Sequence, residues 1–145
     1  MISKRQDIKI ATILPYKENY SFEYASAASL WVAEFYEKSK FKKNCFIYGN
    51  TKSKNYLTKN YINIDLKNLD SKLKSSTKEY SLKLIKEINN KKYDLVEIHN
   101  RPLILFNLIN KIECKFVFLK SLINLDLSFL SFLSLYSNES ALFFE

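Results

Sequence analysis

Short apolar runs recur along the chain and are separated by polar, turn-forming stretches. Each run is rich in β-branched or aromatic residues and too short for a helix, which is typical of strands buried in a sheet. The first run, IKIATIL, is stopped by Pro15, and the second, NCFIY, is followed by the turn pair Gly49-Asn50. The pattern predicts strands at Ile8–Leu14, Asn44–Tyr48, Tyr61–Ile64, Tyr93–Ile98 and Cys114–Phe118.

Between these strands, apolar residues return every three or four positions, which is the period of an amphipathic helix. The pattern predicts helices at about 22–38, 72–89 and 102–112, the last opened by Pro102. The residues expected to line one apolar face of the first helix are Tyr24, Ala27, Ala28, Trp31, Val32 and Phe35. Those expected for the second helix are Leu73, Tyr80, Leu84 and Ile88.

Strands and helices alternate along most of the chain. This alternation predicts an α/β protein with an open, mostly parallel sheet of about five strands. Because crossovers between parallel strands are right-handed, the helices are expected on both faces of the sheet. With 145 residues, 47% of them hydrophobic and 26% charged, the chain is long enough for one globular domain with a buried core.

The composition changes after the last predicted strand. Leucine, serine and phenylalanine dominate residues 119–136, and lysine almost disappears. No clear period distinguishes a helix from a strand there, so two interpretations stand: a helix that packs on the domain, or translation in a shifted reading frame. We therefore expect a domain over residues 1–118 and an apolar, Leu/Ser/Phe-rich tail over residues 119–145.

Charge and rare residue types narrow the function classes. The formal net charge is +8, and the lysine excess lies in residues 37–92. These lysines are scattered rather than gathered with arginine and aromatic residues as in nucleic-acid binders, so we expect no nucleic-acid partner. Two distant cysteines and one histidine argue against a disulfide framework, a zinc site or another resident metal.

No segment of the sequence predicts secretion or insertion into a membrane. The apolar run from Ile10 to Leu14 is too short for a signal sequence. The longest apolar stretch, Leu119 to Tyr136, is interrupted by Lys120 and Asp126. We expect a cytoplasmic protein with at most peripheral contact at the inner face of the membrane, where lysines would meet anionic lipid.

In an open parallel sheet, ligands bind beyond the carboxyl ends of the strands. Two polar segments are expected at that edge: Lys17, Glu18 and Asn19 after the first strand, and Glu97, His99, Asn100 and Arg101 at the end of the fourth. Alternation puts Glu97 and His99 on one face, where the carboxylate would fix the tautomer of the imidazole. The Arg101 guanidinium would hold a carboxylate or a phosphate in its planar fork.

A purely structural interpretation of both segments also stands. The first loop would then be an ordinary exposed loop anchored by its aromatic residues. His99 and Asn100 would cap the following helix, with Arg101 solvated. The loop after the first strand contains no glycine, which argues against a dinucleotide fingerprint and a P-loop, since both bring backbone close to phosphate. We expect no cofactor.

The stretch IATILPYKENYSFEYASAASLWVAEF, followed by YDLVEIHNRP, resembles the N-terminal half of family 4 (group 1) glycosyltransferases of the GT-B fold. The resemblance covers about Ile8 to Phe118, and VEIHNRP is its most distinctive part. It implies a Rossmann-like, acceptor-side domain of an enzyme that moves a sugar from a nucleotide-sugar co-substrate to a glycan or lipid-linked acceptor without a metal. It also implies that the loop from Lys17 and the segment from His99 to Arg101 face a cleft between two domains. With Glu97, these are the substrate-binding residues that we expect.

The chain departs from that family in three ways. Glu18 and Asn19 stand where many members carry a glycine pair, and Leu119-Lys120-Ser121 stands where similar relatives carry a His-Asn loop. The second Rossmann-like domain, which holds the donor and carries paired glutamates, does not fit within 145 residues. Because transfer requires both substrates in one cleft, we expect the chain alone to be inactive, as a truncated enzyme or one half of a split one.

Two function classes therefore follow from the sequence. The first is a glycosyltransferase N-terminal domain in cell-surface polysaccharide or lipopolysaccharide assembly, with catalytic residues that the sequence does not identify. The second is a small flavodoxin-like module that binds a phosphorylated ligand or a partner at the same sheet edge without catalysis. A lone module covers its sheet and folds as a monomer, whereas a severed half exposes apolar surface and needs a partner.

Overall fold

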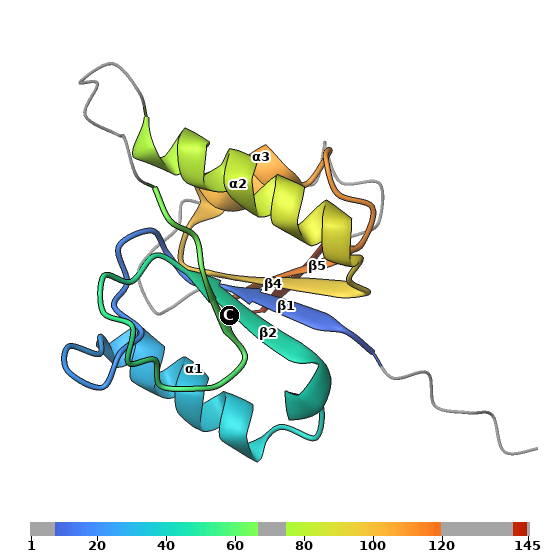
Figure 1. Cartoon of the computed structure of the whole chain (residues 1–145). Helices are drawn as coiled ribbons and strands as arrows, with labels where there is room; N and C mark the ends of the chain where they lie inside the picture. Colours follow the sequence, from blue (N-terminus) through green and yellow to red (C-terminus); the bar gives the residue numbers. More distant parts are fainter. Residues whose placement is uncertain (1–7, 67–74, 120–140, 145) are drawn as a thin grey trace, which may run out of the picture.

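A computed structural model of the chain describes residues 8–66, 75–119 and 141–144, and these form one sheet with helices packed on it (Figure 1). In chain order the elements are β1 (Ile10–Ile13), α1 (Ala27–Lys38), the short helical turn η1 (Lys42–Asn44), β2 (Cys45–Gly49), β3 (Tyr61–Asn63), α2 (Ser76–Lys91), β4 (Leu95–His99), α3 (Pro102–Leu108), β5 (Lys115–Leu119) and β6 (Ala141–Phe144).

Every neighbouring pair of strands in the sheet is parallel, in the order β3-β2-β1-β4-β5-β6. α1 covers one face, and α2 and α3 lie together on the other (Figure 1). The predicted α/β class is confirmed, and the fold is Rossmann-like. The chain first runs outward from β1 to β2 and β3, then returns to place β4 on the other side of β1. Such a reversal of strand order is where open α/β sheets bind their ligands.

The described sheet has one strand more than the sequence pattern predicts. β6 falls within the segment expected to be an apolar tail, and it pairs with β5 from Phe116↔Ala141 to Leu119↔Phe144. The expected domain boundary after Phe118 also falls one residue before the end of β5. The two interpretations of the tail concern mainly residues 120–140, which lie outside the described part of the chain.

α1 begins at Ala27, later than the predicted start near Phe22. Ser26 is its N-cap, and the Ser26 hydroxyl accepts a hydrogen bond from the Ser29 amide at 3.1 Å. The preceding residues are tied instead to the segment after β2, where the Asn55 carbonyl accepts a hydrogen bond from the Phe22 amide. The apolar period therefore continues beyond the true start of the helix, because these distant contacts hold the backbone out of the helical conformation.

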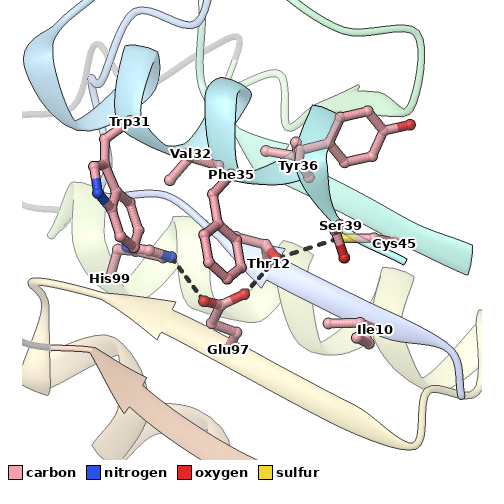
Figure 2. A pocket seen from close by; sticks show the side chains of 11 residues that line it. Ile10, Thr12, Trp31, Val32, Phe35, Tyr36, Ser39, Cys45, Glu97 and His99 are labelled. Carbon is pink, nitrogen blue, oxygen red and sulfur yellow. Dashed lines mark hydrogen bonds and ion pairs between the residues drawn. The ribbon is translucent and has the colours of Figure 1, made fainter. Parts of the chain in front are cut away.

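The buried face of α1 is turned relative to the predicted one. Ser29, Val32 and Tyr36 are buried, whereas Trp31 and Phe35 keep 52% and 59% of their surface exposed. The buried side packs toward β1 and β2, and the two exposed rings stand over the β4 side of the sheet (Figure 2). The prediction that Trp31 and Phe35 belong to the buried face is therefore wrong.

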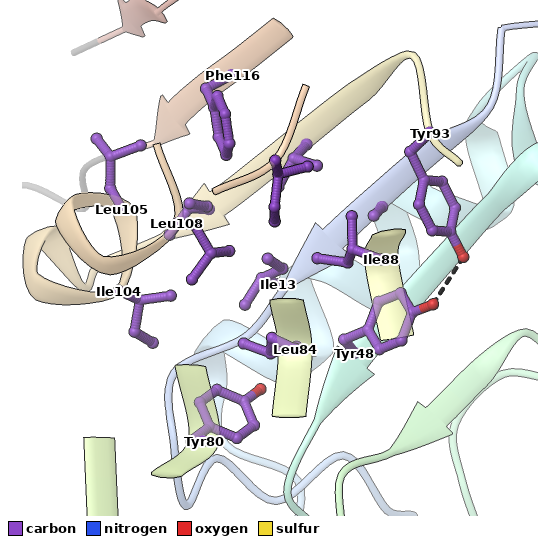
Figure 3. Packing of buried hydrophobic residues seen from close by; sticks show 14 of the residues in the cluster. Ile13, Tyr48, Tyr80, Leu84, Ile88, Tyr93, Ile104, Leu105, Leu108 and Phe116 are labelled. Atoms are coloured by element: carbon purple, nitrogen blue, oxygen red, sulfur yellow. Dashed lines mark hydrogen bonds between the residues drawn. The ribbon is translucent and has the colours of Figure 1, made fainter. Parts of the chain in front are cut away.

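The opposite face of the sheet carries the larger hydrophobic cluster (Figure 3). α2 contributes Tyr80, Leu84 and Ile88, as the sequence predicts, while Leu73 lies outside the described residues. The strands and α3 contribute Ala11, Ile13, Tyr48, Tyr93, Val96, Ile98, Ile104, Leu105, Leu108 and Phe116, among others. This cluster spans four strands and two helices, so it anchors both sides of the strand-order reversal.

A cluster of tyrosines builds much of the smaller core under α1. Tyr20 stacks on Tyr61 with 4.8 Å between ring centroids. Burial raises the pKa of Tyr20 to about 12, so its phenol stays neutral. Gly49, the single glycine of the chain, ends β2 beneath Tyr61, and a Cβ there would come within 2.6 Å of the Tyr61 hydroxyl. A side chain at position 49 would therefore displace the Tyr61 ring.

The other helices lie close to their predicted positions. α2 is capped by Ser75 and ends at Lys91, and α3 begins at Pro102 as predicted but ends at Leu108 rather than near residue 112. Among the described residues, no helix combines the length and the apolar character that a membrane-spanning segment requires.

Replacing Leu84 by alanine should destabilise the fold strongly. Leu84 is fully buried in the larger cluster, so the truncation leaves a cavity and is expected to cost about 2–5 kcal/mol of unfolding free energy. Leu82→Ala on the same helix is the matched control, because Leu82 is half exposed and should change stability by no more than about 0.5 kcal/mol. Urea unfolding followed by circular dichroism measures both, and equal losses would contradict this packing.

Candidate functional site

Both polar segments singled out in the sequence lie at the carboxyl ends of two paired strands, β1 and β4. Lys17 (φ 70°) follows β1 and Asn100 (φ 51°) follows β4, and both backbones are left-handed. Left-handed backbone is costly for residues other than glycine and is tolerated best by asparagine and aspartate. Such strain is often found at functional sites, which draws attention to this edge of the sheet.

The loop after β1 is held in place by its backbone. The Glu18 amide donates to the Pro15 carbonyl at 3.2 Å, and the Asn19 carbonyl accepts from the Ser26 amide at 3.3 Å. Lys17 is exposed, with its Nζ 5.4 Å from the centre of the Tyr16 ring. Among the described residues, the side chains of Glu18 and Asn19 make no hydrogen bond or ion pair, and both residues are partly exposed.

Thr51, which follows β2, fastens this loop to the sheet. Its hydroxyl accepts a hydrogen bond from the Tyr20 amide at 2.9 Å and lies 3.3 Å from the Glu18 carbonyl and 2.7 Å from the Tyr61 hydroxyl. The Thr51 amide donates to the Asn63 side chain at 2.7 Å. Sequence reasoning missed Thr51, although its position directly after a strand is the signal that could have found it.

Glu97 and His99 meet on the α1 side of β4, as the alternation of the strand predicts (Figure 2). Thr12, which pairs with Glu97 in the register of β1 and β4, donates from its hydroxyl to Glu97 Oε2 at 2.8 Å. His99 Nε2 lies 3.3 Å from Glu97 Oε1. Sequence reasoning missed Thr12, because its role requires knowing that β1 and β4 are neighbours.

The environment of Glu97 keeps the carboxylate ionised. Burial is the largest single influence and raises its pKa, but the neighbouring His99 imidazole and the hydrogen bond from the Thr12 hydroxyl together outweigh it. The pKa of Glu97 therefore lies below its ordinary value. An ionised carboxylate beside an imidazole can orient that ring and stabilise its protonated form.

His99 is packed beneath α1 rather than at the start of α3. Only 7% of its side chain is exposed, and its ring meets the edge of Trp31 with 5.7 Å between centroids. Although Nε2 is within ion-pair distance of Glu97, it makes no well-directed hydrogen bond with any described residue. The alternative that His99 caps the following helix does not hold.

Arg101 is the N-cap residue of α3, and its side chain does not cap the helix. Its carbonyl accepts a hydrogen bond from the Ile104 amide at 2.9 Å, while the guanidinium is exposed and pairs with no described residue. Asn100 is half-buried in the turn between β4 and Arg101. The structure therefore places the seven predicted residues in two neighbouring groups, and within the second group Glu97 and His99 interact directly.

A cavity of about 40 Å³ lies between α1 and the β1–β4 side of the sheet (Figure 2). Thr12, Glu97 and His99 are among its polar walls, together with Tyr36 and Ser39, and Trp31 and Phe35 stand at its side. The buried Cys45 thiol, 3.5 Å from the Thr12 hydroxyl, has its pKa raised by burial and stays protonated. Sequence reasoning assigned Trp31 and Phe35 to the core and so missed their place here.

The described residues contain no group of three or more histidine, cysteine, aspartate or glutamate side chains placed to hold a metal ion. What the site offers is hydrogen-bonding and proton-holding chemistry: a carboxylate, an imidazole, a free guanidinium and the polar loop after β1. Comparisons of the chain with protein-family models, curated proteins and solved structures found no match.

Replacing Thr51 by valine should loosen the loop after β1. The buried Tyr20 amide would lose its partner and the Tyr61 hydroxyl would keep only its longer hydrogen bond to Asn63, which is expected to cost about 1–3 kcal/mol of unfolding free energy. Thr58→Val is the matched control, since the buried Thr58 hydroxyl accepts a hydrogen bond from the Tyr20 hydroxyl at 3.3 Å and has no bond to the Tyr20 amide. Hydrogen exchange should accelerate at the Tyr20 amide in Thr51→Val alone, and unchanged exchange there would contradict the anchoring role.

Replacing Glu97 by glutamine should remove part of the acid sensitivity of the fold. The folded pKa of Glu97 lies below the unfolded value of about 4.3, so its ionised form stabilises the fold above that pH, and this contribution is lost as the pH falls through the folded pKa. The stability advantage of the parent chain over Glu97→Gln should therefore shrink between about pH 5 and pH 3. Urea unfolding across this range measures it, with the exposed Glu113→Gln as control. An advantage that grows toward acid would contradict the assignment.

Proposed function

We propose that this chain is the acceptor-side domain of a GT-B glycosyltransferase, which moves a sugar from a nucleotide-sugar to a glycan or lipid-linked acceptor. The observation that carries the proposal is that the segments from Lys17 to Asn19 and from His99 to Arg101 follow adjacent parallel strands beside the strand-order reversal. This is the edge at which such a domain needs substrate-binding side chains. The resemblance of residues 8–118 to the N-terminal half of these enzymes supports the same assignment.

In this proposal, different residues at this edge contact different parts of the substrates. Arg101, exposed and without a described partner, offers two parallel donors to a phosphate of the donor or of a lipid-linked acceptor. Lys17, Glu18 and Asn19 present an ammonium, a carboxylate and an amide to acceptor hydroxyls and phosphates. Because His99 is buried, we assign the Glu97–His99 pair a positioning role at the end of β4 rather than contact with the reacting atoms.

The donor is bound by a second domain in this proposal. The cavity of about 40 Å³ beneath α1 is far smaller than the several hundred Å³ that a ligand of nucleotide-sugar size occupies. Transfer therefore depends on a domain that binds the nucleotide and closes the cleft over the acceptor. The proposed place is the cytoplasmic face of the membrane, in cell-surface polysaccharide assembly, where the net charge of +8 favours contact with anionic lipid.

The second candidate is a non-catalytic, flavodoxin-like interaction module. One observation favours it: Trp31 and Phe35 expose aromatic surface on α1, which suits contact with a partner. The two candidates differ in whether a second domain restores sugar transfer. The experiment that distinguishes them therefore combines this chain with such a domain.

The DNA downstream of the codon for Phe118 should be translated in every frame and examined for a second α/β domain with paired glutamates. That domain and this chain are then assayed, together and apart, for release of nucleoside diphosphate from UDP-, GDP- and dTDP-sugars. We expect release only when both parts and a membrane-glycan acceptor are present, because neither half holds both substrates. The absence of any such frame, or no release from the combined parts, would favour the interaction module.

In the restored enzyme, Arg101→Ala should lower kcat/KM by about tenfold or more, since a hydrogen bond to a charged group contributes about 1.5–3 kcal/mol. Lys111→Ala is the control, because it also removes one exposed cation but lies just before β5, near its amino end. A loss of the same size in both variants would mean that Arg101 acts only through general charge.

A further inference from the structure

Trp31 and Phe35 form an aromatic platform on the surface of α1. They lie four residues apart on the helix, and their rings stack with 5.4 Å between centroids and 14° between planes. About half or more of each residue remains exposed, although packing against the sheet could have buried them. Large aromatic side chains in folded proteins are usually more deeply buried than this, so the platform is a candidate contact surface.

Polar groups converge beside this platform (Figure 2). The ionised Glu97 carboxylate keeps 16% of its side-chain surface exposed toward the cavity. His99 Nε2 is buried beside it without a well-directed hydrogen bond to any described residue. A buried ring nitrogen without a well-directed hydrogen bond destabilises the folded protein, because its lost hydration is not replaced unless a further group bonds to it. The cavity thus holds a carboxylate acceptor and a ring nitrogen that is close to that carboxylate but poorly aligned with it.

The chemistry of these walls selects among ligands. An anion such as phosphate is disfavoured, because the walls contain a carboxylate and neither lysine nor arginine. A pyranose ring matches, because its C–H face stacks on aromatic rings while its hydroxyls can donate to a carboxylate and accept from an imidazole N–H. About 40 Å³ accommodates a hydroxyl or hydroxymethyl group but not a ring, so the ring would lie on the platform outside.

We infer that Trp31 and Phe35 seat one neutral pyranose ring of the acceptor glycan, with one of its hydroxyl groups directed at Glu97 and His99. The choice of a sugar, among molecules with an apolar face and a hydroxyl rim, rests on the proposed function. The subsite begins at the carboxyl end of β4, next to the segment that carries Arg101, so a glycan could extend from the platform to the sheet edge.

The composition of the chain supplies two reporters for this subsite. Trp31 is the only tryptophan and His99 the only histidine, and both line the cavity. The full chain is titrated at pH 7 with the methyl glycosides of glucose, galactose, mannose and N-acetylglucosamine. Tryptophan fluorescence and the NMR signals of the histidine ring protons are followed. At least one glycoside should shift both reporters along the same saturating curve at millimolar concentrations, as expected of a single small ring.

Variants test whether the glycoside binds at the aromatic platform and the cavity beside it. Phe35→Leu removes half of the platform and Glu97→Gln removes the charged acceptor, and each should weaken binding by about fivefold or more, the effect of losing one aromatic or charged contact. Phe41→Leu is the matched control, since Phe41 is 45% exposed, lies beyond the end of α1 and does not line the cavity. Circular dichroism confirms that each variant is folded, and Phe35→Leu, an exposed position, keeps the test valid if Glu97→Gln is unstable.

A linear response to every glycoside, or a saturating one that both variants leave unchanged, would overturn the subsite. Its failure is distinguishable from failure of the proposed function. Saturable glycoside binding without transfer by the combined domains would keep the subsite and reject the transferase. Transfer with an acceptor KM that Phe35→Leu does not alter would keep the transferase and reject the subsite.

Discussion

The hydrogen bond from Thr12 to Glu97 determines what the α1 side of the sheet has to accommodate. Glu97 lies on β4, between β1 and β5, where a carboxylate loses most of its water. An ionised group in that position is tolerated only when it is paired and hydrogen-bonded. The Thr12 hydroxyl donates a hydrogen bond to the carboxylate at 2.8 Å, and His99 Nε2 lies within ion-pair distance of it at 3.3 Å. The sheet therefore carries a polar strip along its centre that apolar side chains alone cannot cover.

The placement of α1 follows from this strip. Val32 and Tyr36 cover the apolar part over β1 and β2, where Leu14, Ile47 and Cys45 complete a small core. Trp31 and Phe35 are left beside the strip, half in contact with it and half in solvent. On the other face, the described strand residues that contribute to the larger cluster are uncharged, and two helices bury them. The molecule is thus firmly packed on one face and open to contact on the other.

The sequence predicts the parts of this arrangement that depend on local pattern. The buried strands, the apolar face of α2 and the shared face of Glu97 and His99 all follow from periodicity. The start and rotation of α1 do not, because Ser26 and Asn55 set them through a cap and a hydrogen bond between segments far apart in sequence. Thr12 was missed for the same reason, because only the strand order makes it a neighbour of Glu97.

The chain makes its turns almost without glycine. Its one glycine lies under Tyr61, yet the turns after β1, α2 and β4 place Lys17, Lys92 and Asn100 in left-handed backbone. Such backbone costs a non-glycine residue about 1–2 kcal/mol in the folded state. Glycine there would instead give the unfolded chain more conformational entropy, at a cost of about 0.4–1 kcal/mol. These two costs are similar in size, and the use of side-chain-bearing residues in place of glycine has a chemical consequence. A ligand at the β1 edge would meet an ammonium and a carboxylate rather than bare peptide N–H groups, so charge would contribute to its recognition and that contribution would weaken as ionic strength rises.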